Sequence, residues 1–196
     1  VSILPTPTIG GVGVLADVTK HATIGFKAEG EAIVLIGETR GWLGQSAYLA
    51  TVCGREEGAP PPVDLAVERR NGEFVRSLIT AGRLSACHDL SDGGLAVALA
   101  EMAMAKGIGA TIAALPAGPA HAVLFGEDQG RYLLSLPAGA AEAIVAEAKA
   151  AGVPAEVIGK TGGGELALPG EVAVSVAALS KTHESWLPDY MVGKAA

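Results

Sequence analysis

The chain contains 196 residues, of which 49% are hydrophobic, and its 21 acidic and 14 basic side chains give a formal net charge of -7. This length and apolar content allow a packed core and exclude a solvated, disordered chain. The acidic balance, without a cluster of Lys and Arg, argues against a nucleic-acid-binding surface, and 4 histidines leave little scope for histidine-rich metal sites.

The cysteines and the lengths of the apolar runs indicate the cellular compartment of the protein. Cys53 and Cys87 lie far apart and form no CxxC pair, so neither a zinc site nor a disulfide framework is predicted. No apolar run approaches the length that spans a bilayer, and the N-terminus lacks the basic and apolar regions of a signal peptide. We therefore expect a cytoplasmic protein with reduced thiols and no membrane partner.

The first part of the chain predicts strands and a short helix. Pro5-Thr6-Pro7 forces an extended lead-in, and residues 9–18 place apolar side chains among glycines, which is typical of a strand with close backbone approach. Residues 32–36 form a compact apolar run and predict a buried strand. After a glycine-flanked turn, residues 42–52 predict a short helix.

Three consecutive prolines within residues 58–62 form the clearest break in the chain. Asp64 can then cap a helix that runs to about Ala81. Asn71-Gly72 is a turn signal inside this segment, but the apolar positions resume in phase beyond it. The pattern therefore predicts one helix.

An acidic turn follows and is the best candidate for chemistry. Residues 84–87 predict a short buried strand, and apolar residues from Leu95 onward recur at helical spacing until a C-cap near Lys106-Gly107. Asp89 and Asp92 stand between this strand and this helix, so we expect them at the mouth of a sheet.

Two interpretations of the acidic turn remain open. Ligands commonly bind outside the carboxyl ends of strands, and glycines at a helix start allow backbone N-H groups to approach a phosphate. Carboxylates there suit a Mg²⁺-nucleotide, because they would repel a bare phosphate. In the alternative, Asp92 caps the helix, Asp89 binds turn amides and His88 is a packed histidine.

The last third repeats strand and helix. Residues 131–136 and 155–158 predict strands, and residues 138–151 predict a helix closed by Gly152. The triple glycine at 162–164 favours a hairpin turn over a phosphate cradle, because another strand, at 165–168, follows it in place of a helix.

Residues 172–187 predict a final strand or helix, with Trp186 and Tyr190 as packing or interface groups. Alternating strands and helices with intervening hairpins predict an α/β (α+β) fold, in which a mixed β-sheet carries packed helices.

Four motifs in this order resemble the phosphoribosylformylglycinamidine synthase family, in the C-terminal part of synthetase subunit II. They are Pro5-Thr6-Pro7-Thr8-Ile9-Gly10-Gly11-Val12-Gly13, Leu43-Gly44-Gln45-Ser46, His88-Asp89-Leu90-Ser91-Asp92-Gly93-Gly94-Leu95-Ala96 and Phe125-Gly126-Glu127-Asp128-Gln129-Gly130-Arg131. The resemblance implies a C-terminal domain of the aminoimidazole ribonucleotide synthetase type. Residues 1–20 would be the last strand of a preceding ATP-binding domain and a linker, and residues 21–196 the C-terminal α/β domain.

The resemblance also implies an activity and partners. The family's ligase uses ATP, Mg²⁺ and glutamine-derived ammonia to convert formylglycinamide ribonucleotide to formylglycinamidine ribonucleotide in purine synthesis. Its partners are the N-terminal domains of the same enzyme, a glutaminase subunit and a small bridging subunit. The family's catalytic histidine and most nucleotide ligands lie in portions absent here, so no catalytic residue is expected in this chain and the fragment alone is expected to be inactive.

The family's enzyme contains two copies of this domain, and the site residues that the resemblance implies depend on which copy this chain corresponds to. Where the family's first copy has a Glu-Ser-Gln substrate contact, this chain has Asp128 in the middle, which resembles the second copy and its auxiliary site. The resemblance therefore implies an auxiliary nucleotide or substrate site, with Asp89 as the metal-ligand candidate. Its other candidates are Asp92, Gly93, Gly94, Glu127, Asp128 and Gln129. The alternatives are a structural or auxiliary nucleotide-binding module, or a relative such as a selenophosphate synthetase or thiamine-monophosphate kinase.

Overall fold

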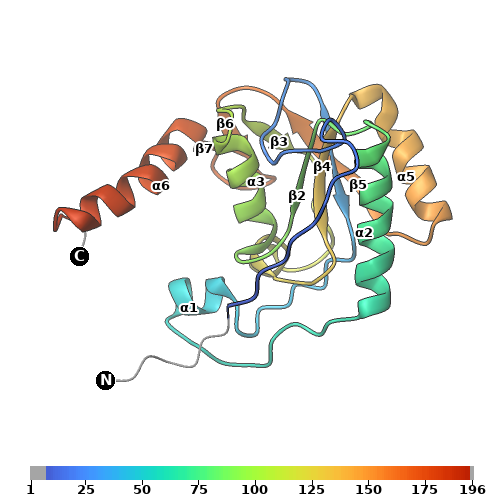
Figure 1. Ribbon diagram of the computed structural model, residues 1–196. Helices are drawn as coiled ribbons and strands as arrows, with labels where there is room; N and C mark the ends of the chain where they lie inside the picture. The colour runs from blue at the N-terminus through green and yellow to red at the C-terminus, as the bar shows by residue number, and fades with distance from the viewer. Residues whose placement is uncertain (1–7, 195–196) are drawn as a thin grey trace.

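The computed structural model describes residues 8–194, in which a seven-stranded sheet is flanked by helices (Figure 1). The strands are β1 (Ala32–Ile36), β2 (Ala86–Asp89), β3 (Ala110–Ile112), β4 (Tyr132–Leu136), β5 (Ala155–Thr161), β6 (Glu165–Ala167) and β7 (Val174–Ser175). The helices are α1 (Ala47–Cys53), α2 (Leu65–Thr80), α3 (Gly94–Met104), α4 (Ala120–Phe125), α5 (Ala141–Ala150) and α6 (Val176–Met191), with a short 3-10 turn, η1 (Ala138–Ala140), before α5.

The sheet is mixed, with the order β2-β4-β1-β5-β3-β6-β7. All neighbouring strands run antiparallel except β3 and β6, which are parallel. The predicted strand at 32–36 is confirmed as β1, which lies between β4 and β5 and is buried along its whole length.

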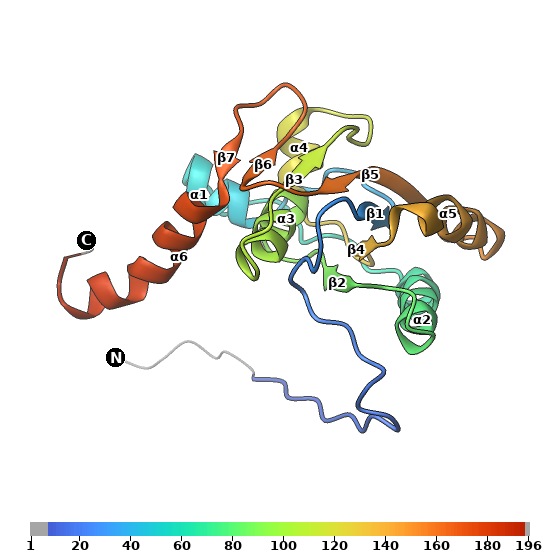
Figure 2. The ribbon, with the colours of Figure 1, turned by 90° about the horizontal axis from the view of Figure 1, so that it is seen from above.

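Helices cover both faces of the sheet. Because strand side chains alternate, β1 directs Ile33 and Leu35 into a core shared with α3, and Val34 and Ile36 into a second core shared with α2 and α5. Figures 1 and 2 show α3 on one side of the sheet and α2 with α5 on the other. The predicted class, a mixed sheet with packed helices, is confirmed.

Local signals located several helices correctly. Asp64 caps α2 by accepting from the N-H groups of Ala66 and Val67, and the helix continues through Gly72 as predicted. The helix expected over 138–151 is present as η1 followed by α5. None of the helices within residues 8–194 has the length and hydrophobicity of a membrane span.

The strand predicted at residues 9–18 is wrong, because the structure shows no strand there. Ile9 is 91% exposed and Val14 is 95% exposed, and no strand of the described residues pairs with this segment (Figure 2). An extended apolar segment forms a strand only where a partner satisfies its backbone groups. The Pro5-Thr6-Pro7 lead-in lies outside the described residues.

The helix predicted at 42–52 begins later. Gln45 has a positive φ of 57°, which is incompatible with a helix, and Ser46 is the N-cap of α1, its hydroxyl accepting from Leu49 N-H at 3.3 Å. Residues 42–46 instead form a loop that contacts the segment before the prolines, where Trp42 Nε1 donates to the carbonyl of Ala59.

The glycine-rich turn after β5 is not a hairpin. β5 and β6 do not pair with each other, because β3 lies between them. Gly162 N-H donates to Gly109 O and Gly109 N-H donates to Gly163 O, so the turn crosses over the start of β3. The sequence analysis missed β3, which has only three residues, and α4; the alternatives for 172–187 are both present, as β7 followed by α6.

Candidate functional site

Glu127 joins the starts of two helices. Its Oε1 accepts from the N-H groups of Ala47 and Gly93, at 2.8 Å each, at the beginnings of α1 and α3. Its own N-H donates to Trp42 O at 2.8 Å. With only 8% of the residue exposed, this carboxylate occupies the electropositive ends of two helices and holds them together.

Asp128 closes the loop that follows β1. Its Oδ2 accepts from Arg40 N-H at 2.9 Å and Gly41 N-H at 2.8 Å, and its Oδ1 accepts from Trp42 N-H at 3.2 Å. The residue is 6% exposed. Three backbone donors thus stabilise its charge, in the way that a buried carboxylate requires.

Arg131 completes this buried network. It is 1% exposed, and its guanidinium donates to Gly126 O at 2.6 Å, Asp128 O at 3.0 Å and Thr39 Oγ1 at 3.2 Å. Burial lowers the pKa of Arg131, and the nearby Asp128 charge opposes that decrease. The sequence analysis included this arginine only as the end of a motif and the start of a strand; the one available signal was a charged residue beside a buried apolar run.

The carboxylates of the acidic turn are exposed, unlike those of Glu127 and Asp128. Asp89 ends β2 with 64% of its side chain exposed, 3.4 Å from His88 Nδ1, and His88 Nε2 lies 2.7 Å from Glu101 Oε2. Asp92 is exposed and does not cap α3, because the N-cap position is occupied by Gly93, which has no side chain to cap the helix. These two carboxylates are therefore accessible, whereas Glu127 and Asp128 are buried.

Gly93 and Gly94 allow the backbone at the start of α3 to pack closely against its neighbours. Gly94 has a φ of +65°, and a Cβ on it would lie 2.4 Å from Gly126 O. Gly93 has a φ of +78° and would meet Val97. Only glycine fits both the conformation and the space, so the start of α3 can contact the loop that carries Glu127.

The candidate residues thus fall into two groups. Glu127, Gly93 and Gly94 meet at one junction, while Asp128, the next residue of the same loop as Glu127, accepts from the loop after β1. Gln129 is exposed, and its Nε2 donates to Glu127 O at 3.1 Å. Within residues 8–194, no group of three or more His, Cys, Asp or Glu side chains could hold a metal ion.

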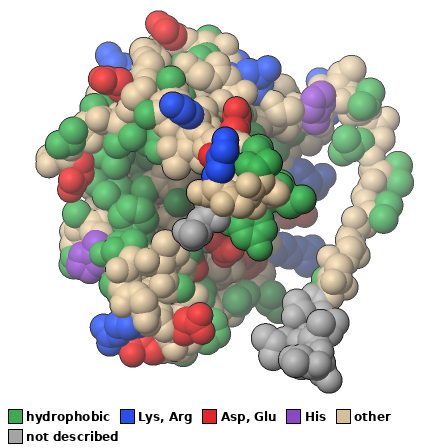
Figure 3. Space-filling model, turned by 90° about the vertical axis from the view of Figure 1, so that its left-hand side faces the viewer, with side chains coloured by type: hydrophobic (Ala, Val, Ile, Leu, Met, Phe, Trp, Pro, Cys, Tyr) green, Lys and Arg blue, Asp and Glu red, His purple; other side chains and the backbone are tan. Residues whose placement is uncertain are grey.

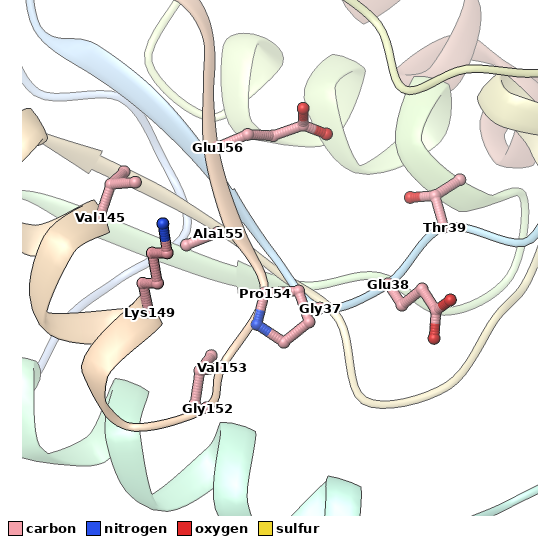
Figure 4. Close-up of a pocket in the computed structure, with 10 residues that line it drawn as sticks. All are labelled: Gly37, Glu38, Thr39, Val145, Lys149, Gly152, Val153, Pro154, Ala155 and Glu156. Carbon is pink, nitrogen blue, oxygen red and sulfur yellow. The ribbon is translucent and has the colours of Figure 1, made fainter.

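Two cavities lie near the loop after β1. One of about 560 Å³ is lined by Glu38, Lys149 and Glu156 among others, between the end of β1, the end of α5 and the start of β5 (Figure 4). The second, of about 160 Å³, is lined by Trp42, Asn71, Asp128, Gln129 and neighbouring residues at the beginning of α2. Neither is lined by Asp89 or Asp92.

A third cavity, of about 490 Å³, is an apolar groove between α3 and α6 that includes Val97, Met104 and Leu179. Beyond it the second half of α6 projects from the sheet (Figure 2), and hydrophobic side chains are open to solvent on this side of the molecule (Figure 3). Trp186 and Tyr190 are 60% and 58% exposed and stack on each other at 5.4 Å, so within the described residues they pack only at the surface.

The chain is similar to known proteins over nearly its whole length. Residues 28–168 match the family model described as AIR synthase related protein, C-terminal domain. The chain is 63% identical over 195 residues to the phosphoribosylformylglycinamidine synthase subunit PurL of Bradyrhizobium sp. (strain BTAi1), covering 99% of this chain and 26% of that protein. It therefore spans about a quarter of the length of such relatives.

Solved structures show the same fold. Thermotoga maritima PurL complexed with FGAR superposes with a TM-score of 0.67 at 17% identity, over 82% of this chain and 29% of that one. The structure of PurLQS from the same organism gives 0.61 at 16% identity, over 82% and 27%. Since the family model covers well over half of its residues, the chain belongs to the AIR synthase related proteins, as a C-terminal domain of that family.

Proposed function

We propose that the chain is a domain of phosphoribosylformylglycinamidine synthase, the ATP-dependent carbon-nitrogen ligase that converts formylglycinamide ribonucleotide to formylglycinamidine ribonucleotide with glutamine-derived ammonia. The observation that carries this proposal is the 63% identity to a PurL subunit over 99% of the chain. Since the chain corresponds to a quarter of that subunit, it would contribute to an active site formed elsewhere, and no residue in it is assigned a catalytic role.

We also propose ATP as the cosubstrate and further protein subunits as partners. Structures of T. maritima PurL with ATP and with FGAR support ATP as the cosubstrate of the complete enzyme, and the PurLQS structure supports an assembly with further subunits. For this chain we propose contacts with the N-terminal domains of the same enzyme, a glutaminase subunit and a small bridging subunit.

The exposed side of the acidic turn is our candidate for an auxiliary nucleotide site. Asp89 and Asp92 are accessible, while Gln129 lies on the loop held by Glu127. Mg²⁺ is typically bound by one or two carboxylates plus phosphates and waters, so Asp89 could provide one ligand but the described residues do not complete a site. Gly93, Gly94, Glu127 and Asp128 would support this site by holding the loops.

A structural role is the second candidate, and it has its own support. The carboxylates of Glu127 and Asp128 are buried and accept backbone N-H groups, which is what a structural module requires. In that case the turn would organise α3 and bind no nucleotide.

A domain graft tests the proposal. Replacing the matching quarter of the Bradyrhizobium PurL with this chain should preserve FGAR-dependent and ammonia-dependent release of phosphate from ATP. The matched control replaces the same quarter with the corresponding domain of E. coli HypE, which shares the fold at a TM-score of 0.53 but only 21% identity, and should abolish turnover. A soluble, folded graft without activity would contradict the proposal.

A further inference from the structure

One face of α6 continues beyond the part of the helix that packs on its own domain. Val176 is 1% exposed, and Leu179 and His183 line the apolar groove of about 490 Å³ that faces α3. Trp186 and Tyr190 follow at helical spacing, so these five side chains lie on one face of α6. This face therefore passes from the core, at the start of the helix, to solvent in its second half.

The uncovered part of this face is apolar. Trp186, Leu187, Tyr190 and Met191 are all more than half exposed within the described residues. The rings of Trp186 and Tyr190 stack with their centroids 5.4 Å apart, so they present one continuous aromatic surface. Contiguous apolar patches are rare on the surface of a soluble domain and mark sites of protein contact.

The groove between α3 and α6 extends this surface. Its wall includes Val97 and Met104 of α3 and Leu168 after β6, and its one carboxylate, Glu101, lies 2.7 Å from Nε2 of His88. That carboxylate therefore already has a partner within this domain. The chemistry of groove and helix together fits an apolar protein surface and offers little to a charged one.

The segment before β1 carries a second set of exposed apolar side chains. They are Ile9, Val12, Val14, Leu15 and Val18. In both ribbon views this segment runs toward the side of the molecule from which α6 projects (Figures 1 and 2). Under the proposed function, residues 1–20 connect this domain to the preceding ATP-binding domain, which would therefore adjoin the side that carries α6.

Length and connectivity favour that preceding domain as the occupant. The chain corresponds to 26% of its Bradyrhizobium PurL relative, so about three quarters of such a polypeptide lies outside it. A domain joined by a short connecting segment has an effective concentration on the order of millimolar. A second copy or a separate subunit does not reach this concentration in dilute solution.

We infer that the exposed face of α6 and the adjoining groove form the surface on which the preceding domain of the same polypeptide docks, through apolar side chains of that domain. Trp and Tyr are enriched among the residues that dominate such interfaces, which gives Trp186 and Tyr190 the central part. This assignment rests on the proposed function, which supplies the preceding domain, and it adds the surface that this domain contacts.

Photo-cross-linking in the full-length polypeptide that carries this chain tests the docking. Benzoylphenylalanine is incorporated in place of Trp186, the polypeptide is irradiated without any other subunit, and the cross-linked peptides of the monomer band are identified by mass spectrometry. We expect cross-links to the preceding domain. Cross-links confined to residues 8–194, cross-links that appear only in a dimer band, or none at all would overturn the inference.

The same probe in place of Leu65 is the matched control. Leu65 is 78% exposed at the start of α2, which covers the opposite face of the sheet from α3 (Figure 2). We expect a much lower yield of cross-links to the preceding domain from this position. Equal yields from the two positions would overturn the inference.

A pair of charge substitutions in the full-length polypeptide gives a second measurement. Trp186→Glu should lower the melting midpoint by about 3 °C or more, because it places a charge in the docked interface. Within its own domain Trp186 is exposed, and Glu is a better helix former than Trp, so the domain alone gives no reason for this loss. Leu65→Glu is the control and should leave the midpoint unchanged; equal midpoints for the two variants would overturn the inference.

Release of phosphate from ATP with formylglycinamide ribonucleotide and ammonia, measured on the same full-length polypeptide, separates this inference from the proposed function. Turnover without cross-links to the preceding domain would overturn the docking surface and leave the ligase assignment standing. Cross-links to the preceding domain without turnover would support the docking surface and contradict the ligase assignment.

Discussion

The carboxylate of Glu127 accepts the backbone N-H of Gly93 at 2.8 Å, across 34 residues of sequence. This bond ties the loop before β4 to the first turn of α3. Since Gly93 is the N-cap of α3 and no side chain caps the helix from within, Glu127 supplies from another loop the acceptor that the helix start needs.

Asp128 should matter for stability, and Asp92 should not. Asp128→Asn replaces one acceptor oxygen by an NH₂ group that faces backbone donors, so we expect a loss of about 2–4 kcal/mol in unfolding free energy. Asp92→Asn, at an exposed position of the neighbouring turn, is the control and should change stability by no more than about 0.5 kcal/mol. Urea unfolding of both variants checks this, and equal effects would refute the division into buried and accessible carboxylates.

Gly94 should not tolerate a methyl group. Gly94→Ala combines a positive φ with a contact of 2.4 Å to Gly126 O, and we expect a loss of about 2–5 kcal/mol. Gly139→Ala is the control, because a Cβ there meets nothing within 4 Å. Thermal unfolding measures the difference; a Gly94→Ala melting midpoint equal to that of Gly139→Ala would show that the glycine is not required by packing.

Cys87 should make the fold sensitive to alkaline pH. Burial raises its pKa from 9.0 to about 12, with a further contribution from Asp89. Above about pH 9 the unfolded chain releases this proton while the folded chain keeps it, so stability falls as pH rises from 9 to 12. The slope is at most about 1.4 kcal/mol per pH unit.

Chemical unfolding between pH 8 and 11 measures that slope. Cys87→Ala should make it shallower, and Cys53→Ala, which removes the exposed thiol, should leave it unchanged. Burial also raises the pKa of Tyr132, and this part of the slope persists in both variants. An unchanged slope in Cys87→Ala would contradict the assignment.

Asp89 tests the proposed auxiliary site. In the full-length enzyme, Asp89→Asn should weaken binding of ADP-Mg²⁺ more than binding of formylglycinamide ribonucleotide, because its exposed carboxylate is the candidate metal ligand. Calorimetry with each ligand gives the two affinities. Equal losses, or none, would exclude the site, and a lowered melting midpoint without ligand would favour the structural role.

The sequence predicted correctly those helices and strands whose signal lies within their own residues. The cap at Asp64, the apolar run of β1 and the alanine-rich segment of α5 each carry their own signal, and the structure has each element at that place. The strand expected at 9–18 failed for the opposite reason, since a strand depends on a partner that the pattern does not name.

Long-range relationships were not visible in the sequence. The insertion of β3 between β5 and β6 turned an expected hairpin into a crossover, because a glycine-rich turn does not determine which strand pairs next. Likewise, Glu127 and Asp128 were selected as ligand candidates, and only the fold brings their carboxylates to the N-H groups of distant loops.

Phosphate release from ATP, measured in parallel on the isolated chain and on the full-length polypeptide that contains it, tests the central claim most directly. With formylglycinamide ribonucleotide and ammonia, we predict turnover by the full-length polypeptide and none above blank by the isolated chain. Turnover by the isolated chain, or a folded full-length polypeptide without substrate-dependent turnover, would contradict the assignment of this chain as a non-catalytic domain of the ligase.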